Sequence, residues 1–329
     1  MSLTIGVDVG GTKVAAGVVD DHGHIVEKLR RATPAASPER TAAVIAEVVT
    51  ELLGRHDARA VGVGAAGFVD EAAGTVAFAP NLAWRSEPLR AKVAAMVGLP
   101  VTVDNDGNAS AWAEFRFGAA RGHAHVIFVS VGTGIGAGFV LDSRLYRGRW
   151  GMAGEPGHVR VVPDGRLCGC GNRGCWEQYA SGSALVTEAR DLAMRSPGGA
   201  RRLLQLAEGN PAAIGGPQVT EAAREGDPAA LRCFAIVGTW LGQGLADLTA
   251  ILDPGCIVVG GGVSEAGELL LGPARAAFEK ALTGAGYRPQ VEITRAALGA
   301  DAGIVGAADL VKNGRPGPAR IAPGRPRGA

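Results

Sequence analysis

The chain has 329 residues, which is enough for two domains of ordinary size. Its 33 basic and 32 acidic residues give a formal net charge of +1, so its charge does not favour nucleic acid as the main partner. The longest apolar runs have the length of strands and are interrupted by glycine, which argues against membrane association. The first residues enter a strand pattern directly, so we expect no secretory signal and a cytoplasmic protein.

The first pattern along the chain is a strand, a glycine turn and a second strand. Leu3 to Val9 forms the first strand, Gly10-Gly11-Thr12-Lys13 the turn, and Val14 to Val19 the second strand. Backbone amides in such a turn, together with the Thr12 hydroxyl, can bind phosphate oxygens, and Asp8 is placed to hold a magnesium ion directly or through water. An ordinary hairpin is the alternative, because short glycine signatures are common.

A second set of candidate functional residues comes after a predicted helix from Ser37 to Leu53 and a predicted strand from Val101 to Val103. The strand ends in Asp104-Asn105-Asp106, and a helix from Ala109 to Phe117 follows. Open α/β sheets place their chemistry at this end of a strand. Asp106 is our candidate general base and Asn105 its hydroxyl-orienting partner. Capping of the next helix by the two acids is the alternative, and the two roles are compatible.

The opening pattern then repeats. Val126 to Val131 is a buried strand, Gly132-Thr133-Gly134-Ile135-Gly136 is its turn, and Ala137 to Leu141 is the return strand. A strand follows the turn where a dinucleotide-binding Rossmann motif would have a helix, so the Rossmann interpretation is weak. Two copies of one pattern predict an internally duplicated α/β fold, in which each half supplies one phosphate-binding turn.

Four metal-ligating residues lie close together in the next segment: His158, Cys168, Cys170 and Cys175. Three thiolates and one imidazole make a complete tetrahedral shell for structural zinc, and the intervening glycines allow the tight turns that this requires. Disulfides are the competing interpretation. A Cys-x-Cys pair is short for an unstrained bridge, and a reducing compartment fits the odd number of five cysteines better.

Two carboxylates flank these ligands, Glu155 three residues before His158 and Glu177 two residues after Cys175. Ordering a loop of this length costs about 1 to 2 kcal/mol per residue, and zinc supplies on the order of 10 to 16 kcal/mol. The loop must therefore also pack on a larger body. A rigid loop would hold both carboxylates in fixed positions, where they can accept hydrogen bonds from vicinal hydroxyls of a sugar.

The C-terminal part is rich in predicted helices, among them one from about Ala229 to Leu252, and ends with strands and a final helix. The strand from Cys256 to Val259 runs into Gly260-Gly261-Gly262, where the backbone can approach adenosine closely; a plain tight turn is the alternative. Cys233 and Cys256 have apolar neighbours and are expected in the core. Residues 314–329 carry four arginines and no acid, and we expect a disordered tail.

Four motifs in this order resemble those of the ROK family of repressors and sugar kinases: D-x-G-G-T from Asp8, G-T-G-x-G from Gly132, E-P-G-H from Glu155, and C-x-C-G-x-x-G-C-x-E from Cys168. The resemblance covers residues 3 to 312 and is strongest to the family's bacterial ATP-dependent glucokinases. It implies an actin-like, ribonuclease-H-like ATPase fold of two α/β domains with internal duplication and a cleft between them. It also implies ATP, Mg2+ and structural Zn2+ as cofactors.

The resemblance also implies roles for individual residues. Asp106 matches the base that takes the proton from the sugar 6-hydroxyl. The sugar-binding set consists of Gly67, Asn105, Asp106, Glu155, His158 and Glu177. The nucleotide-binding set consists of Asp8, Gly10, Gly11, Thr12, Lys13, Thr133, Gly134, Gly261 and Gly262. His158 is expected to bind zinc through one ring nitrogen and to face the sugar with the other side of its ring.

We therefore expect ATP-dependent phosphorylation of glucose at the 6-hydroxyl, in a small domain of residues 1–107 plus 302–313 and a large domain of residues 108–301. Kinases for mannose, fructose, N-acetylglucosamine or N-acetylmannosamine are the alternatives, and polyphosphate is an alternative donor. A sugar-responsive transcriptional regulator is a weaker alternative, because the first strand begins at Leu3 and leaves no room for a DNA-binding domain before it. Dimers or tetramers are the expected assemblies.

Overall fold

The structure is a computed structural model that describes residues 2–313. It divides into two compact units: unit 1 contains the chain up to Asp106, Arg147–Ala153 and the chain from Ala307, and unit 2 contains Gly107–Tyr146 and Gly154–Gly306. The expected boundaries, 1–107 with 302–313 and 108–301, assign the short segment Arg147–Ala153 to the larger domain and stay a prediction. The predicted disordered tail, residues 314–329, lies outside the described residues.

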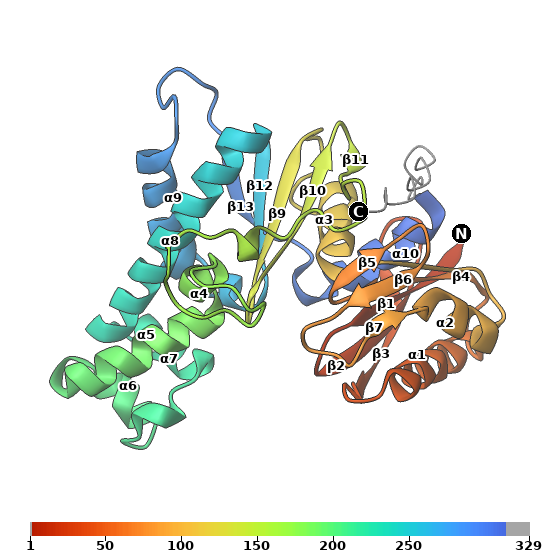
Figure 1. The fold of residues 1–329 in the computed structure, drawn as a ribbon, viewed down its shortest axis with the longest axis horizontal. Helices are drawn as coiled ribbons and strands as arrows, with labels where there is room; N and C mark the ends of the chain where they lie inside the picture. Colours follow the sequence, from red (N-terminus) through yellow and green to blue (C-terminus); the bar gives the residue numbers. More distant parts are fainter. Residues whose placement is uncertain (1, 314–329) are drawn as a thin grey trace, which may run out of the picture. The chain divides into compact units, whose positions relative to one another are not determined.

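Unit 1 is built on a five-stranded sheet with the order β3-β2-β1-β4-β8 (Figure 1). Its strands are β1 (Leu3–Val9), β2 (Lys13–Val19), β3 (Ile25–Ala32), β4 (Ala58–Ala65) and β8 (Val101–Asn105). Strand β1 pairs antiparallel with β2 and parallel with β4, which pairs parallel with β8. The carboxyl ends of β1, β4 and β8 therefore meet at one edge, where Asp8 pairs with Gly64 and Gly64 with Asp104.

Helix α1 (Pro38–Leu53) covers this sheet and begins where the sequence predicts. The Ser37 side chain accepts a hydrogen bond from the Arg40 N–H at 3.2 Å, and Pro38 occupies the first turn, where its missing N–H costs nothing. The apolar face of α1, including Ile45, Val48 and Val49, is buried in the core of unit 1. A small sheet and a second helix complete the unit: β5 (Phe68–Asp70), β6 (Thr75–Phe78), β7 (Arg85–Glu87) and α2 (Leu89–Val97).

The part of the last helix, α10 (Ala302–Asn313), that follows Gly306 belongs to unit 1 and lies directly on its strands. A Cβ atom on Gly62 of β4 would stand 1.8 Å from the Ala307 carbonyl oxygen, so only glycine permits this approach. The Thr4 hydroxyl donates a hydrogen bond to the Ala308 carbonyl at 3.0 Å, and the Lys312 ammonium donates one to the Ser2 carbonyl at 2.7 Å. The C-terminal helix thus closes a unit that begins at the N-terminus.

Unit 2 repeats the sheet of unit 1, with the order β11-β10-β9-β12-β13. Its strands are β9 (Val126–Val131), β10 (Ile135–Leu141), β11 (Arg144–Leu145), β12 (Cys256–Gly260) and β13 (Glu292–Arg295). In both sheets the first strand is central, antiparallel strands lie on one side of it, and parallel strands lie on the other. The predicted internally duplicated α/β fold is confirmed.

Helices surround this second sheet. They are α3 (Asp106–Arg116), α4 (Glu177–Ala180), α5 (Gly182–Arg195), α6 (Arg201–Leu206), α7 (Gly216–Arg224), α8 (Pro228–Leu252) and α9 (Glu268–Ala281). Short 3-10 turns lie between some of these elements: η1 (Pro156–His158), η2 (Pro197–Gly199), η3 (Pro211–Ala213), η4 (Gly262–Ala266) and η5 (Gly299–Asp301). Helix α3 begins three residues before its predicted start, since Asp106 already belongs to its first turn.

Helix α8 is the central helix of unit 2 and packs along α9. A Cβ atom on Gly242 would stand 2.0 Å from the Ala274 carbonyl oxygen of α9, so the two helix backbones lie unusually close. By length and composition α8 is long and apolar enough to cross a membrane, but its side chains Cys233, Phe234 and Val237 are buried in the core of unit 2. A buried core helix meets the same criteria, so α8 is weak evidence for a membrane span.

Candidate functional site

The four predicted zinc ligands converge in unit 2. The ligand atoms of His158, Cys168, Cys170 and Cys175 lie within 4.8 Å of one another. All three thiols are free, with the Sγ atoms of Cys170 and Cys175 3.7 Å apart, well beyond the roughly 2.05 Å of a disulfide bond. The disulfide alternative therefore does not describe this segment.

The spacing of these atoms fits zinc. A tetrahedral ion with Zn–S bonds of about 2.3 Å and a Zn–N bond of about 2.0 Å separates its ligand atoms by roughly 3.5 to 3.8 Å. The distance between Cys170 Sγ and Cys175 Sγ is 3.7 Å, and that between Cys168 Sγ and His158 Nδ1 is 3.6 Å. Nδ1 is thus the ring nitrogen that faces the cluster, which leaves Nε2 on the other side of the ring.

The zinc loop, residues 158–175, is held by its own turns. Bridges pair Arg160 with Cys175 and Leu167 with Arg173, and the Cys168 N–H donates to the Asn172 carbonyl at 2.8 Å. Gly174 has a φ of +78°, and a Cβ atom there would stand 1.6 Å from the Val162 carbonyl oxygen. The turn that brings Cys175 to the cluster therefore requires glycine.

Trp176 anchors the loop in the core of unit 2. Its side chain is 2% exposed, and its indole N–H donates to the Trp240 carbonyl of α8 at 2.8 Å. A Cβ atom on Gly244 would stand 2.2 Å from the indole ring, so α8 leaves a glycine-sized space for it. The loop thus packs on a larger body, as the balance between ordering cost and zinc binding predicts.

Glu177 lies between the zinc cluster and the turn that joins β9 and β10. Its Oε1 atom is 3.0 Å from Cys168 Sγ, and its Oε2 atom accepts a hydrogen bond from the Ile135 N–H at 3.3 Å. A Cβ atom on Gly134 would stand 2.3 Å from Oε2. The glycine of the second turn therefore makes room for this carboxylate, a function of Gly134 that the sequence did not suggest.

The E-P-G-H segment packs on the start of β10. Glu155 precedes the turn η1, His158 ends it, and the His158 N–H donates to the Glu155 carbonyl at 3.2 Å. A Cβ atom on Gly157 would stand 2.4 Å from the Ile135 carbonyl oxygen, so this glycine lets the segment lie against the strand. Glu155, His158 and Glu177 are all half-buried, with part of each side chain accessible to a ligand.

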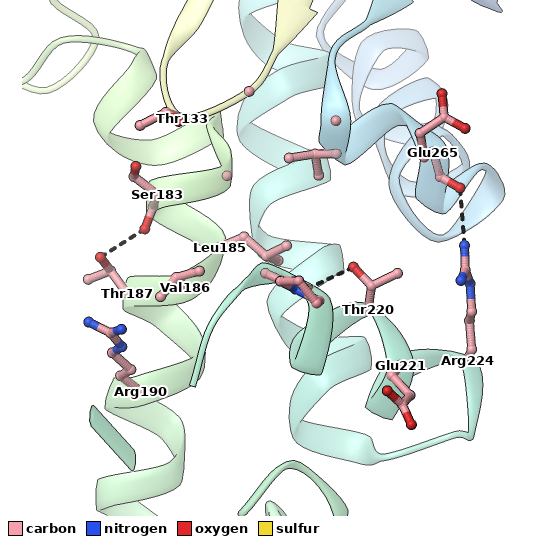
Figure 2. A pocket seen from close by; sticks show the side chains of 16 residues that line it. Thr133, Ser183, Leu185, Val186, Thr187, Arg190, Thr220, Glu221, Arg224 and Glu265 are labelled. Atoms are coloured by element: carbon pink, nitrogen blue, oxygen red, sulfur yellow. Dashed lines mark hydrogen bonds between the residues drawn. The ribbon is translucent and has the colours of Figure 1, made fainter. Parts of the chain in front are cut away.

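A cavity of about 1120 Å³ opens in unit 2 beside the second glycine turn (Figure 2). It is lined by residues of that turn and of α5, α7 and η4: Gly132, Thr133, Gly182, Ser183, Leu185, Val186, Thr187, Arg190, Gly216, Pro217, Thr220, Glu221, Arg224, Gly262, Val263 and Glu265. Pockets of about 300 to 1,000 Å³ hold small organic ligands, so this one has room for a nucleotide.

The cavity is lined by parts of two predicted nucleotide-binding elements, the turn with Gly132 and Thr133 and the turn with Gly262. The Gly182 N–H at the start of α5 donates to the Gly132 carbonyl at 2.7 Å, which sets the N-terminus of a 14-residue helix beside the second turn. The positive end of a helix dipole can attract phosphate. On another wall the Arg224 guanidinium donates to the Glu265 carbonyl oxygen at 3.2 Å, as Figure 2 shows.

The third glycine turn follows β12. Gly261 has a φ of +83°, and a Cβ atom there would stand 2.5 Å from the Val131 carbonyl oxygen at the end of β9. Gly262 has open space around its Cβ position and lines the cavity. The two glycines thus serve different purposes, since Gly261 allows close packing of the backbone and Gly262 leaves room on the cavity side.

The remaining predicted residues lie in unit 1, at the carboxyl edge of its sheet. Asp8 lies next to the β1–β2 turn that contains Gly10, Gly11 and Thr12. Burial, with a further contribution from the nearby Asp106 carboxylate, raises the pKa of Asp8 to about 6, and the Lys13 ammonium opposes the shift. The structure thus brings together the predicted magnesium-binding carboxylate and the predicted base.

Asn105 is fixed by a neighbouring loop of unit 1. Its side-chain amide donates a hydrogen bond to the Gly67 carbonyl oxygen at 3.0 Å. Gly67 has a φ of +123°, and a Cβ atom there would stand 2.4 Å from the Phe78 carbonyl oxygen, so no other residue fits its place. Two members of the predicted sugar-binding set, far apart in sequence, are therefore in direct contact.

Asp104 has a role that sequence reasoning missed. Its Oδ2 atom accepts hydrogen bonds from Arg147 Nε at 2.8 Å and Nη2 at 2.6 Å, and its Oδ1 atom accepts one from the Asn105 N–H at 2.8 Å. A paired carboxylate thus positions the backbone of Asn105. No local sequence signal indicates a partner 43 residues away.

The predicted residues fall into two groups, one in each unit. Asp8, Gly10, Gly11, Thr12, Lys13, Gly67, Asn105 and Asp106 lie in unit 1, and Thr133, Gly134, Glu155, His158, Glu177, Gly261 and Gly262 lie in unit 2. The cavity walls from α5 and α7 were missed, because residues such as Arg190 and Thr220 belong to no short motif.

Comparison with known proteins identifies the family. The family model described as "ROK family" matches residues 4–314. This chain belongs to the ROK family. It is 49% identical to the glucokinase of Streptomyces coelicolor over 316 residues, which cover 96% of this chain and 99% of that one. It is 36% identical to the glucokinase of Thermotoga maritima, over 94% of this chain and 96% of that one.

A solved structure supports the same conclusion for the fold. The crystal structure of a ROK family glucokinase from Streptomyces griseus in complex with glucose and AMPPNP has a TM-score of 0.88 and 52% identity, and the match covers 94% of this chain and 99% of that one. The predicted family is therefore confirmed, and so is the predicted actin-like ATPase fold.

Proposed function

We propose that this chain transfers the γ-phosphoryl group of ATP to the 6-hydroxyl of glucose. The observation that carries the proposal is the likeness, over 94% of the chain, to a glucokinase whose structure holds glucose and an ATP analogue. The 49% identity to a second glucokinase over 96% of the chain supports the same substrate pair. The arrangement of charged and polar groups in each unit is suited to the reaction.

Asp106 is the proposed general base, which accepts the proton of the 6-hydroxyl as the oxygen attacks phosphorus. It is the first residue of α3, at the carboxyl edge of the unit 1 sheet. Asn105 would orient a sugar hydroxyl, since its side-chain amide is held in place by a hydrogen bond to the Gly67 carbonyl at 3.0 Å. In this proposal Asn105 orients the sugar and the adjacent Asp106 accepts the proton.

The two glycine turns are the proposed phosphate-binding elements. Backbone amides of Gly10 to Thr12 with the Thr12 hydroxyl, and Thr133 with Gly134, would bind phosphate oxygens. Lys13 follows the first turn and adds a positive charge. Asp8 would hold the magnesium ion, which when bound neutralises charge on the phosphates. The adenosine would occupy the cavity beside Gly261 and Gly262.

Glu155 and Glu177 are the proposed acceptors for sugar hydroxyls, and His158 is the proposed donor to a sugar oxygen. The zinc ligands His158, Cys168, Cys170 and Cys175 fit a structural ion, which when bound fixes the loop and supplies no chemical step. His158 Nε2 would then remain for the sugar, because Nδ1 faces the cluster. The Glu177 carboxylate is restrained by the Ile135 N–H, from which Oε2 accepts a hydrogen bond at 3.3 Å.

A coupled assay tests the proposal. Purified protein is offered glucose, mannose, fructose, N-acetylglucosamine and N-acetylmannosamine, each with ATP or polyphosphate as donor. We expect the highest kcat/KM for glucose with ATP. A higher value for another sugar would change the substrate and keep the kinase, whereas no transfer to any of the five sugars from either donor would reject the kinase itself.

We also propose that the protein acts in the cytoplasm as a homodimer or homotetramer and binds neither nucleic acid nor membrane. Most soluble oligomers are closed symmetric assemblies of identical chains. Light scattering coupled to size-exclusion chromatography measures the mass directly, and a mass equal to the 33.4 kDa of one chain would contradict the proposed assembly.

A further inference from the structure

A second cluster of metal-ligating side chains lies in unit 2 and shares no residue with the zinc loop or the cavity. It consists of His123, Cys256 and Glu292, whose ligand atoms lie within 4.8 Å of one another. His123 Nε2 and Glu292 Oε2 are 3.6 Å apart. Among residues 2–313 this is one of two such groups with a cysteine, and the other is the zinc cluster.

The sheet itself brings these side chains together. Cys256 is the first residue of β12 and Glu292 the first of β13, and the two are paired in the parallel register. Directly paired residues point to the same face of a sheet, so the thiol and the carboxylate are neighbours. Strands β9, β12 and β13 lie side by side in Figure 1, and His123 precedes the start of β9 by three residues.

The segment that carries His123 is held against the start of β12. The Gly255 N–H donates to the His125 carbonyl at 3.0 Å, and the His123 N–H donates to the Ala120 carbonyl at 3.3 Å. A Cβ atom on Gly255 would stand 3.2 Å from His123 Nδ1, so the glycine leaves room for the imidazole ring. The ring therefore lies beside Cys256, with Nε2 turned toward Glu292.

The chemistry of the three groups suits a borderline-soft divalent cation. Cys256 is fully buried, whereas the side chains of His123 and Glu292 are 32% and 58% exposed. The cluster thus has a sulfur ligand at its base and nitrogen and oxygen ligands at its solvent side. Thiolate, imidazole and carboxylate are the usual zinc ligands, and sites with three protein ligands keep a fourth position for water.

We propose that His123, Cys256 and Glu292 form a second zinc-binding site, with water as the fourth ligand. The Cys256 thiol releases its proton to solvent as the sulfur–metal bond forms, neutral His123 binds through Nε2, and Glu292 binds as carboxylate. Ligand atoms of a tetrahedral zinc ion lie roughly 3.3 to 3.8 Å apart. The three ligand atoms here lie within 4.8 Å of one another, and rotation of the exposed Glu292 side chain can bring its carboxylate oxygen to the distance that zinc requires. The ion joins the start of β12, the start of β13 and the segment before β9.

Metal content of the full-length protein tests the site. The protein is reconstituted with excess zinc, freed of unbound metal by gel filtration and analysed for zinc per chain. We expect two zinc ions per chain in the native protein and one in both Cys256→Ser and His123→Gln. Cys233→Ser is the matched control, since Cys233 is equally buried but belongs to neither cluster of the described residues, and it should keep two.

Thermal stability gives an independent readout. Added zinc should raise the Tm of protein that already holds one ion, and it should leave the Tm of His123→Gln unchanged. Glucose phosphorylation by His123→Gln should equal that of the native protein, because His123 belongs to neither the proposed sugar nor the proposed nucleotide set. His123 is partly exposed, so this variant decides the question if Cys256→Ser does not fold. One zinc in the native protein, or a second ion that persists in His123→Gln, would overturn the proposal.

Discussion

The two units have separate sheets of the same topology, but the sheets differ at the end of the central strand. Asp8 of β1 pairs with Gly64 of β4, and Ser130 of β9 pairs with Gly260 of β12 at the corresponding place. Unit 1 therefore has a half-buried carboxylate where unit 2 has a neutral hydroxyl. The duplicated backbone provides two glycine turns, and only the first has a carboxylate beside it that could hold a cation next to a bound phosphate.

The units also differ in how their polar groups are fixed. In unit 1 the Asp104–Arg147 ion pair supports the Asn105 backbone, and a hydrogen bond to Gly67 holds its side chain. In unit 2 a candidate zinc cluster and the buried Trp176 hold the segment with Glu177. Unit 1 thus relies on one ion pair between a strand residue and a residue outside the sheet, whereas unit 2 relies on a metal-binding loop inserted between β11 and β12.

The largest expected effect is on the proposed base of unit 1. Asp106→Asn should lower kcat about 1,000-fold and leave the KM for glucose nearly unchanged, because an amide keeps a hydrogen bond to the hydroxyl but cannot accept its proton. Steady-state kinetics measure both constants. The exposed Asp57→Asn serves as the control and should retain full activity. Turnover within tenfold of the native value would reject Asp106 as the base.

Loss of the zinc cluster tests how unit 2 is fixed. Cys170→Ser should release the loop zinc, lower the Tm and raise the KM for glucose, since structural zinc supplies on the order of 10 kcal/mol toward ordering a small site. Cys170 is exposed, so little packing is lost with its sulfur. Leu167→Ser, 62% exposed in the same loop, is the control. A fall in zinc content without a change in KM would separate the loop from sugar binding.

The ion pair of unit 1 should be costly to break. Asp104→Asn removes the carboxylate that pairs with the Arg147 guanidinium, whose side chain is 12% exposed. We expect destabilisation of about 3 kcal/mol and a rise in the KM for glucose through the displaced Asn105 backbone. Chemical denaturation measures the first and kinetics the second. Arg147→Met with Asp104→Leu, which removes both charges, should recover part of the stability but not the KM.

Replacing Asp8 should stabilise the protein near neutral pH, whereas replacing Asp104 should destabilise it. Its raised pKa means that its stabilising contribution is fully present below about pH 4 and is lost as the pH rises through about 6. Asp8→Asn should therefore stabilise the magnesium-free protein at pH 7.5 by up to about 3 kcal/mol, change little at pH 4, and abolish magnesium-dependent activity. Tm values across this pH range check the sign. Equal destabilisation of Asp8→Asn at both pH values would contradict a raised pKa for Asp8.

The smallest effect concerns the glycine beside Glu177. Gly134→Ala introduces a Cβ atom 2.3 Å from Glu177 Oε2 and should displace the carboxylate, lowering kcat/KM roughly 10-fold. Gly136→Ala is a matched control in the same segment, because no atom lies within 4 Å of its added Cβ. If the two variants behave alike, the approach of Glu177 to the turn has no functional weight.

The sequence predicted the parts of this molecule that local patterns encode. The Ser37-Pro38 start of α1 and the convergence of the four zinc ligands follow from short-range rules of capping and ligand spacing. Helix α3 begins earlier than predicted, because Gly107 and Asn108 resemble turn residues while the packing around them enforces a helix. The partner of Asp104 and the cavity walls of α5 and α7 depend on long-range contacts, which residue spacing does not reveal.

The position of α10 has a consequence for the order in which the protein is made. Strand β1 is translated well before α10, the helix that lies on Gly62 and accepts the Thr4 hydrogen bond. About 200 residues separate Asp106 from Ala307, which at about 5 to 20 residues per second is a delay of roughly 10 to 40 s. During that interval unit 2 can complete its own sheet before unit 1 is complete, so the nascent chain should depend on chaperones mainly through its segment up to Asp106.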